Sequence, residues 1–164
     1  MNRRNALLML GAIPFATRVA SAASPQIVIH KTPTCGCCGV WVAHMEKAGF
    51  TAQVHYMDDL TPVKTRLKVP ARLASCHTGE IGGYFVEGHV PAADVQRLLR
   101  EKPAALGLTV PGMPAGSPGM EVPSGRVDAY DVLLVAKDGS TSVFSSYGKQ
   151  DAITTIAGRS ALRD

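Results

Sequence analysis

The stretch PQIVIHKTPTCGCCGVWVAHMEKAG, residues 25–49, decides the fold. It begins with a short apolar run, residues 25–30, which predicts a β-strand. It ends with a segment in which Trp41 and Met45 stand one helical turn apart, followed by a glycine, which predicts a helix over residues 40–48. Three cysteines therefore lie between a predicted strand and a predicted helix.

The rest of the chain continues to alternate strands with helices. Further strands are predicted at residues 50–57, 83–87, 130–136 and 141–147, and further helices at residues 63–68 and from Pro91 to Pro103. Asp138-Gly139 predicts a hairpin turn between the last two strands, and four prolines make residues 110–124 irregular. A βαβ start with cysteines at its first junction indicates a thioredoxin-like α/β fold. We expect a central mixed sheet with flanking helices and a C-terminal hairpin.

The first 22 residues have the features of an export signal. Residues 1–5 are basic, residues 6–16 are apolar, and residues 20–22 (ASA) form a small-x-small cleavage site. The apolar run is too short for an ordinary transmembrane helix, although an uncleaved anchor is the alternative. The sequence therefore predicts a signal peptide at residues 1–22, a single mature domain at residues 23–164 and a periplasmic location.

The net charge limits the classes of partner. The whole chain carries a formal charge of +4, and removing residues 1–22 takes away Arg3, Arg4 and Arg18. The mature chain keeps 14 basic and 13 acidic residues, a charge of +1. A nearly neutral chain without a basic stripe does not indicate binding to nucleic acid or to an anionic membrane. We expect neither partner, and no stable membrane insertion after signal cleavage.

The cysteine cluster allows several kinds of chemistry. Amide N–H groups and the positive end of the dipole at a helix N-terminus favour thiolate over thiol, which makes cysteines there more acidic. A structural disulfide is one interpretation, since exported proteins often contain them. A thiol–disulfide oxidoreductase is another, with Cys35 as the attacking thiolate and Cys38 as the resolving thiol. That reaction leaves Cys37 and Cys76 unexplained.

Metal binding is the third interpretation. A structural zinc site usually takes well-separated ligand pairs around one tetrahedral ion. Here three thiols come from one short segment, and Cys37 and Cys38 are adjacent. Several Cu(I) ions bridged by thiolates use such thiols more naturally than one zinc ion, and thiolate and thioether ligands favour Cu(I). Copper is therefore preferred to zinc, which remains an alternative.

Further ligands are sought elsewhere in the chain. Cys76 stands beside His77, in the segment before the strand predicted at residues 83–87, where a thioredoxin-like layout would bring it to the cluster. An ordinary surface or core cysteine is the alternative. Met113 and Met120 lie in the glycine- and proline-rich loop and are candidate thioether ligands, unless they are incidental to it. The remaining histidines are expected to be structural or exposed: His30, His44, His55 and His89.

Five short motifs occur in order along the chain. They are TCGCC at 34–38, SCHT at 75–78, VEGHVP at 86–91, VPGMP at 110–114 and GSPGME at 116–121. In this combination the chain resembles the CopG-type copper-resistance proteins, also described as a domain of unknown function, over roughly residues 26–148. The resemblance implies an exported thioredoxin-like protein that binds copper, with Cys35, Cys37, Cys38 and Cys76 as ligands of a multi-copper cluster. It also implies redox interconversion of Cu(I) and Cu(II), and periplasmic copper-handling proteins as partners.

Overall fold

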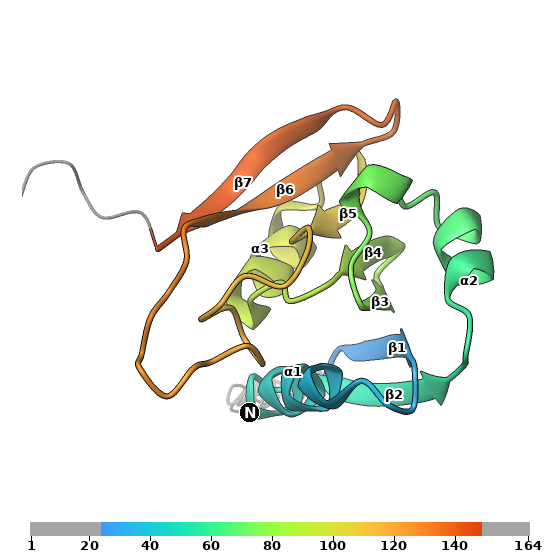
Figure 1. The fold of residues 1–164 in the computed structure, drawn as a ribbon. Helices are drawn as coiled ribbons and strands as arrows, with labels where there is room; N and C mark the ends of the chain where they lie inside the picture. The colour runs from blue at the N-terminus through green and yellow to red at the C-terminus, as the bar shows by residue number, and fades with distance from the viewer. Residues whose placement is uncertain (1–23, 149–164) are drawn as a thin grey trace, which may run out of the picture.

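The computed structural model describes residues 24–148 (Figure 1), and the predicted signal peptide at residues 1–22 lies outside these described residues. The strands are β1 Gln26–Lys31, β2 Thr51–Tyr56, β3 His77–Ile81, β4 Tyr84–Glu87, β5 Ala105–Thr109, β6 Tyr130–Ala136 and β7 Thr141–Tyr147. The helices are α1 Gly36–Lys47, α2 Thr61–Arg66 and α3 Ala92–Glu101, with a 3₁₀ turn at Ala71–Leu73. Among the described residues, no helix combines the length and apolar character needed to cross a bilayer.

All seven strands form one mixed sheet in the order β2-β1-β3-β4-β5-β6-β7. β1 pairs in parallel with β2, as the connection through α1 requires, and antiparallel with β3. β4 pairs in parallel with β5, and β6 and β7 form the predicted antiparallel hairpin. The prediction of an α/β domain with a mixed sheet and a C-terminal hairpin is therefore confirmed.

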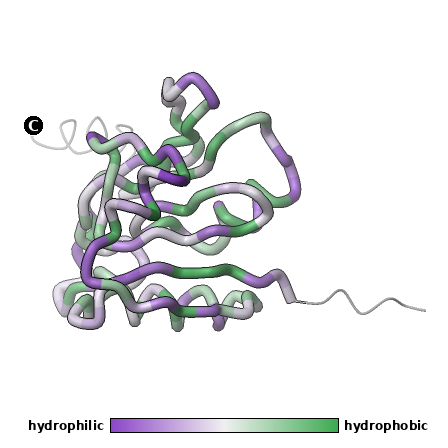
Figure 2. Tube along the Cα trace, turned by 90° about the vertical axis from the view of Figure 1, so that its right-hand side faces the viewer, coloured by the Kyte–Doolittle hydropathy of each residue, from purple (hydrophilic) through white to green (hydrophobic). Residues whose placement is uncertain are grey.

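The sheet separates two apolar cores. The larger core packs Trp41 and Met45 of α1 and Leu98 of α3 against residues from several strands. The smaller core, on the opposite face, contains Phe85 of β4, and the adjacent Val86 faces the larger core. This alternation follows from the two-residue period of a strand. Figure 2 shows hydrophobic stretches along several strands and hydrophilic segments at loops and turns.

Two strands were missed by the sequence-based prediction. β3 has the sequence HTGEI, which is too polar for an apolar strand pattern. Most of it is nevertheless buried, and the Thr78 hydroxyl is hydrogen-bonded inside the protein to Lys64 and Glu87. β5 contains Gly107, a residue depleted in strands. A Cβ at Gly107 would lie 2.1 Å from the carbonyl oxygen of Phe85, so the pairing of β4 with β5 requires glycine there.

Helix α1 begins at Gly36, four residues before the predicted start at residue 40. Cys35 is the N-cap residue, with extended backbone, and its N–H donates to the carbonyl of Thr32 at 3.2 Å. Cys37 and Cys38 consequently belong to the first helical turn. The apolar periodicity from Trp41 onward could not reveal this turn, because its residues are glycine and cysteine.

Candidate metal centre

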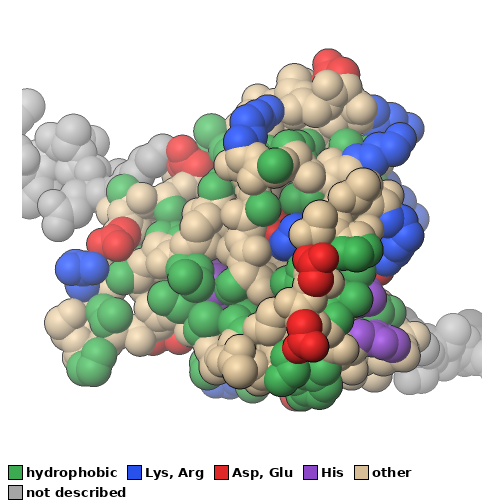
Figure 3. Space-filling model, turned by 45° about the vertical axis from the view of Figure 1, so that its right-hand side comes forward, with side chains coloured by type: hydrophobic (Ala, Val, Ile, Leu, Met, Phe, Trp, Pro, Cys, Tyr) green, Lys and Arg blue, Asp and Glu red, His purple; other side chains and the backbone are tan. Residues whose placement is uncertain are grey.

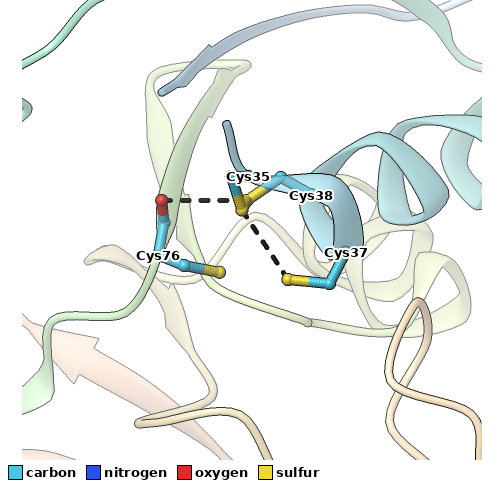
Figure 4. A group of neighbouring side chains, drawn as sticks. All are labelled: Cys35, Cys37, Cys38 and Cys76. Atoms are coloured by element: carbon cyan, nitrogen blue, oxygen red, sulfur yellow. Dashed lines mark hydrogen bonds between the residues drawn. A yellow bond between two sulfur atoms is a disulfide. The ribbon is translucent and has the colours of Figure 1, made fainter. Parts of the chain in front are cut away.

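Four cysteines from two separate segments meet at the N-terminus of α1 (Figure 4). Cys35, Cys37 and Cys38 come from the cap and first turn of α1, and Cys76 comes from the residues directly before β3. The four Sγ atoms all lie within 4.8 Å of one another. The Cys37 and Cys76 side chains point toward one another beneath the Cys35–Cys38 pair. The fold thus concentrates every cysteine of the chain in one place.

Two of the four thiols are oxidised in the structure. Cys35 and Cys38 form a disulfide, whereas Cys37 and Cys76 are free and partly exposed. The Cys37 Sγ lies 3.6 Å from that of Cys35, and the Cys38 Sγ lies 3.8 Å from the carbonyl oxygen of Cys76. Four thiolates become available together only after this disulfide is reduced.

The free Cys76 thiol is held in its protonated form. Burial, followed by the nearby Cys37, raises the pKa of Cys76 to about 11, although a hydrogen bond from Ser75 acts in the opposite direction. A metal ion that binds this sulfur must displace its proton.

A buried ion pair fixes the backbone beside Cys76. The Glu87 carboxylate is fully buried, pairs with the Lys64 ammonium and accepts a hydrogen bond from the Ser75 amide at 2.6 Å. Lys64 Nζ also donates to the Ser75 carbonyl at 3.1 Å, and Thr78 Oγ1 donates to Glu87 at 2.7 Å. Desolvation is the strongest influence on Glu87 and raises its pKa, opposed first by Lys64. Both backbone polar groups of Ser75 are therefore anchored.

This anchor was missed by the sequence analysis. Part of this anchor is visible in the sequence, because Glu87 is a charged residue at the end of the otherwise apolar strand YFVE of β4. A carboxylate in such a strand must find a buried partner. Its partner, Lys64, is 23 residues away on α2 and could not be identified from the pattern.

The irregular segment 110–124 lies against the start of α1, as Figure 1 shows. A Cβ at Gly119 would lie 2.8 Å from the Cys37 carbonyl oxygen and 2.9 Å from the Trp41 amide nitrogen. Ser75 Oγ donates a hydrogen bond to the Gly112 carbonyl at 2.6 Å, so the segment also contacts the residue that precedes Cys76. The segment therefore borders the cysteine group from two directions.

The two candidate methionines belong to this segment. Met113 is 52% exposed. Met120 is partly buried, and its backbone is fixed by hydrogen bonds with Gly116 and Ser117 at 2.8 Å each. Met113 and Met120 thus follow Gly112 and Gly119, the two residues by which the segment contacts Ser75 and α1, and their role as ligands stays a prediction.

Two buried histidines, His77 and His89, adjoin Cys76. His77 Nδ1 lies 3.3 Å and His89 Nε2 lies 3.2 Å from the Cys76 Sγ, and both side chains are fully buried. Burial is the main cause that lowers the pKa of His77, to about 3, and that of His89. His89 was expected to be structural or exposed, and spacing could not connect it with Cys76 because 13 residues and a strand hairpin separate them.

The surface of the protein carries charged side chains of both signs. Basic and acidic side chains both appear on the face drawn in Figure 3, with hydrophobic side chains exposed between them.

Comparison with known proteins identifies similar structures. One, described as "Copper resistance protein copG- Form 2", is 49% identical, with a TM-score of 0.71, over 75% of this chain and 98% of its own. Another, "Copper resistance protein copG- Form 1", is 48% identical, with a TM-score of 0.72, over 76% of this chain and 99% of its own. A family model described as "Protein of unknown function, DUF411" matches residues 73–120. No curated protein matches the chain.

Proposed function

This chain belongs to the CopG family of copper resistance proteins, and we propose that it binds Cu(I) in a multi-copper cluster bridged by the thiolates of Cys35, Cys37, Cys38 and Cys76. The observation that carries the proposal is the meeting of four Sγ atoms within 4.8 Å of one another. Thiolates are soft ligands that favour Cu(I). Cys37 and Cys38 are adjacent in the chain, an arrangement that suits bridging between ions better than four-fold coordination of one zinc ion.

The surrounding residues support this role in two ways. The Lys64–Glu87 pair holds Ser75, and therefore fixes Cys76 opposite the first turn of α1. The segment that carries Met113 and Met120 borders the same site, and we propose that their thioethers contribute further soft ligands. Copper is cargo of this protein in copper resistance, passed to or from other copper-handling proteins.

The Cys35–Cys38 pair supports copper redox activity at the same site. When two thiolates close to a disulfide, they release two electrons, which reduce two Cu(II) ions to two Cu(I) ions. The Cys35–Cys38 disulfide in the structure has the oxidation state that such a step would leave. A thiol reductant would reopen the pair and restore all four thiolates.

We also propose an exported, thioredoxin-like protein that works in the periplasm. Support comes from the β1-α1-β2 unit with cysteines at its first junction and from the order β2-β1-β3-β4, in which β1 and β2 are parallel and β3 and β4 antiparallel. α1 and α3 contribute to one apolar core, and the segment after α2 contributes to the other. The signal sequence proposed at residues 1–22 supplies the route of export.

Titration of fully reduced protein with Cu(I) tests the cluster. We expect several Cu(I) ions per wild-type chain, and a drop of at least about one ion per chain in Cys37→Ser, since a bridging thiolate is lost. The matched control is Val40→Ser, one turn further along α1 at a side chain that is 52% exposed. This control should bind as many ions as the wild type. Unchanged stoichiometry in Cys37→Ser would refute the cluster.

A thiol–disulfide oxidoreductase is the second candidate, favoured by the Cys35–Cys38 disulfide at the start of α1. An insulin-reduction assay on metal-free protein separates it from the copper proposal. Rapid turnover that Cys35→Ser abolishes, together with weak Cu(I) binding, would establish the enzyme. We expect slow turnover and tight Cu(I) binding, because thiol exchange uses two of the four clustered cysteines and gives no role to Cys37 or Cys76.

A further inference from the structure

The seven-stranded sheet ends in two outer strands, β2 and β7, which differ in regularity (Figure 1). The register of β7 against β6 shifts between Val132 and Leu133, which is a bulge. A bulge twists an edge strand and hinders its pairing with another molecule. β2, with the sequence TAQVHY, pairs with β1 in an unbroken parallel register and contains no Asp, Glu, Lys, Arg or proline. β2 therefore lacks the usual features that block pairing at the edge of a sheet.

The backbone of β2 offers hydrogen-bonding groups along its free side. The Thr51 amide donates to the Pro25 carbonyl at 3.0 Å, and the Met57 amide donates to the Lys31 carbonyl at 3.1 Å. Backbone groups alternate in direction along a strand, so the odd-numbered residues of β2 are the ones that bond to β1. The backbone N–H and C=O groups that point away from β1 belong to Ala52, Val54 and Tyr56. Within residues 24–148, no strand pairs with β2 on that side.

The spacing of these three residues allows β2 to pair with β2 of a second copy. In an antiparallel arrangement with its two-fold axis at Val54, Val54 lies opposite Val54 of the second copy, and Ala52 lies opposite Tyr56 of the second copy. Each pair then exchanges both of its backbone hydrogen bonds, as the hydrogen-bonded pairs of an antiparallel ladder do. This position of the axis provides a partner for every backbone group that β2 presents at the edge.

The apolar side chains of β2 fit the same register. Ala52 and Val54 are partly buried and pack against the larger core, whereas Tyr56 is 66% exposed. All three lie on one face of the sheet, because residues two apart in a strand share a face. The pairing would place the ring of Tyr56 against the small side chain of Ala52 and the two Val54 side chains against each other. Pairs of this kind between neighbouring strands stabilise a sheet.

The polar side chains on the opposite face are also compatible with this register. Gln53 would lie opposite His55 of the second copy. The two residue types already form a hydrogen bond within one chain, at 3.0 Å between Gln53 Nε2 and His55 Nε2. Because β2 carries no Asp, Glu, Lys or Arg, the pairing does not place two such like charges opposite each other.

We propose that β2 is the interface of a two-fold homodimer in which antiparallel pairing of residues 51–56 joins the sheets of two chains into one continuous sheet. A second copy is the partner because one register is self-complementary in the backbone and on both faces of the strand. An interface that uses the same surface of both chains is the kind that a two-fold dimer requires. None of the four cysteines belongs to β2, so this inference does not depend on the proposed copper function.

Sedimentation equilibrium of the metal-free mature protein, kept under a thiol reductant to exclude intermolecular disulfides, measures this association. We expect a mass that rises with concentration to twice that of one chain. Val54→Pro removes the N–H group at the axis, and an edge strand tolerates proline where its N–H faces solvent. We expect this variant to weaken dimerisation by about tenfold or more, because each copy loses a hydrogen-bond donor. Val54→Thr is the matched control, since it keeps the N–H and the branched side chain, and it should dimerise as the wild type does.

Tyr56→Ser provides a second test at an exposed side chain, where the fold of the single chain does not depend on the ring. We expect it to weaken dimerisation by about tenfold, because the contact with Ala52 of the second copy is lost. Its control is Val143→Ser on β7, a side chain that is 58% exposed, which should leave the dimer unchanged. Circular dichroism confirms that each variant is folded.

Amide hydrogen exchange tests the register directly. Raising the protein concentration should slow exchange at the Val54 and Tyr56 amides, and leave the Gln53 and His55 amides unchanged because these already bond to β1. A dimer without slower exchange at Val54 and Tyr56 would overturn the proposal, as would a dimer that neither Val54→Pro nor Tyr56→Ser weakens. A chain that stays monomeric at about 1 mM would also overturn it, and would leave this edge to a strand of a different protein.

Discussion

Replacing Glu87 by Ala is expected to lower the free energy of unfolding by about 3–5 kcal/mol, because it leaves a buried ammonium without its counter-charge. The carboxylate of Glu87 is fully buried and the side chain of Lys64 is only 16% exposed. The same change removes the acceptor of the Ser75 amide, which has no second partner among the described hydrogen bonds. Urea denaturation monitored by circular dichroism measures the loss.

The loss of the Glu87 carboxylate should also loosen the backbone beside the metal centre. Ser75 precedes Cys76, so we expect the Cys76 thiol of Glu87→Ala to react faster with an alkylating reagent than that of the wild type. Glu101→Ala is the control, because this carboxylate is 54% exposed and its pair with Arg97 should contribute at most about 1 kcal/mol. A loss in Glu87→Ala no larger than the loss in Glu101→Ala would show that the buried pair does not hold this region together.

Replacing Gly119 by Ala is expected to cost about 2–4 kcal/mol and to lift the segment 110–124 from α1. Gly119 has a φ of +87°, which an alanine adopts only with strain. Its Cβ would also meet two backbone atoms of α1, the Cys37 oxygen and the Trp41 nitrogen, at 2.8 and 2.9 Å. Backbone atoms cannot move aside as a flexible side chain can, so the steric cost adds to the cost of the dihedral angle.

Gly125→Ala separates these two costs. Gly125 has a φ of +69° but no atom within 4 Å of its would-be Cβ, so this control keeps the backbone strain and removes the collision. We expect a loss of about 1 kcal/mol for the control. We also expect faster modification of the Cys37 thiol in Gly119→Ala only. Equal losses in the two variants would mean that close contact with α1 is not what holds the segment in place.

Several features were accessible from the sequence because they depend on local chemistry. The strands of the C-terminal hairpin have the predicted bounds, residues 130–136 and 141–147, because Asp138-Gly139 encodes the turn between two alternating runs. β1 and α1 followed from an apolar run and from the spacing of Trp41 and Met45. The proximity of Cys35, Cys37 and Cys38 needed no structure, since the chain itself keeps them together.

Other features depend on partners distant in the sequence and could not be read from a local pattern. β3 was missed because its polar residues are buried by long-range partners, as in the hydrogen bond from Thr78 to Glu87. β5 was missed because Gly107 is required by the close approach of Phe85, a neighbour only in the folded sheet. The ion pair of Lys64 and Glu87, which anchors Ser75, could not be predicted either, because these residues are neighbours only in the folded protein.

The sequence by itself therefore determined that this protein concentrates thiols at the start of a helix and that it resembles copper-resistance proteins. Those conclusions require only residue types and their spacing within short segments. The tertiary structure decided that Cys76 joins the other three cysteines, that the imidazoles of His77 and His89 lie against its sulfur, and that a buried ion pair holds the residue before it. Pairing of β1 with β3 and of β3 with β4 brings these residues together, and strand pairing is a property of the whole sheet.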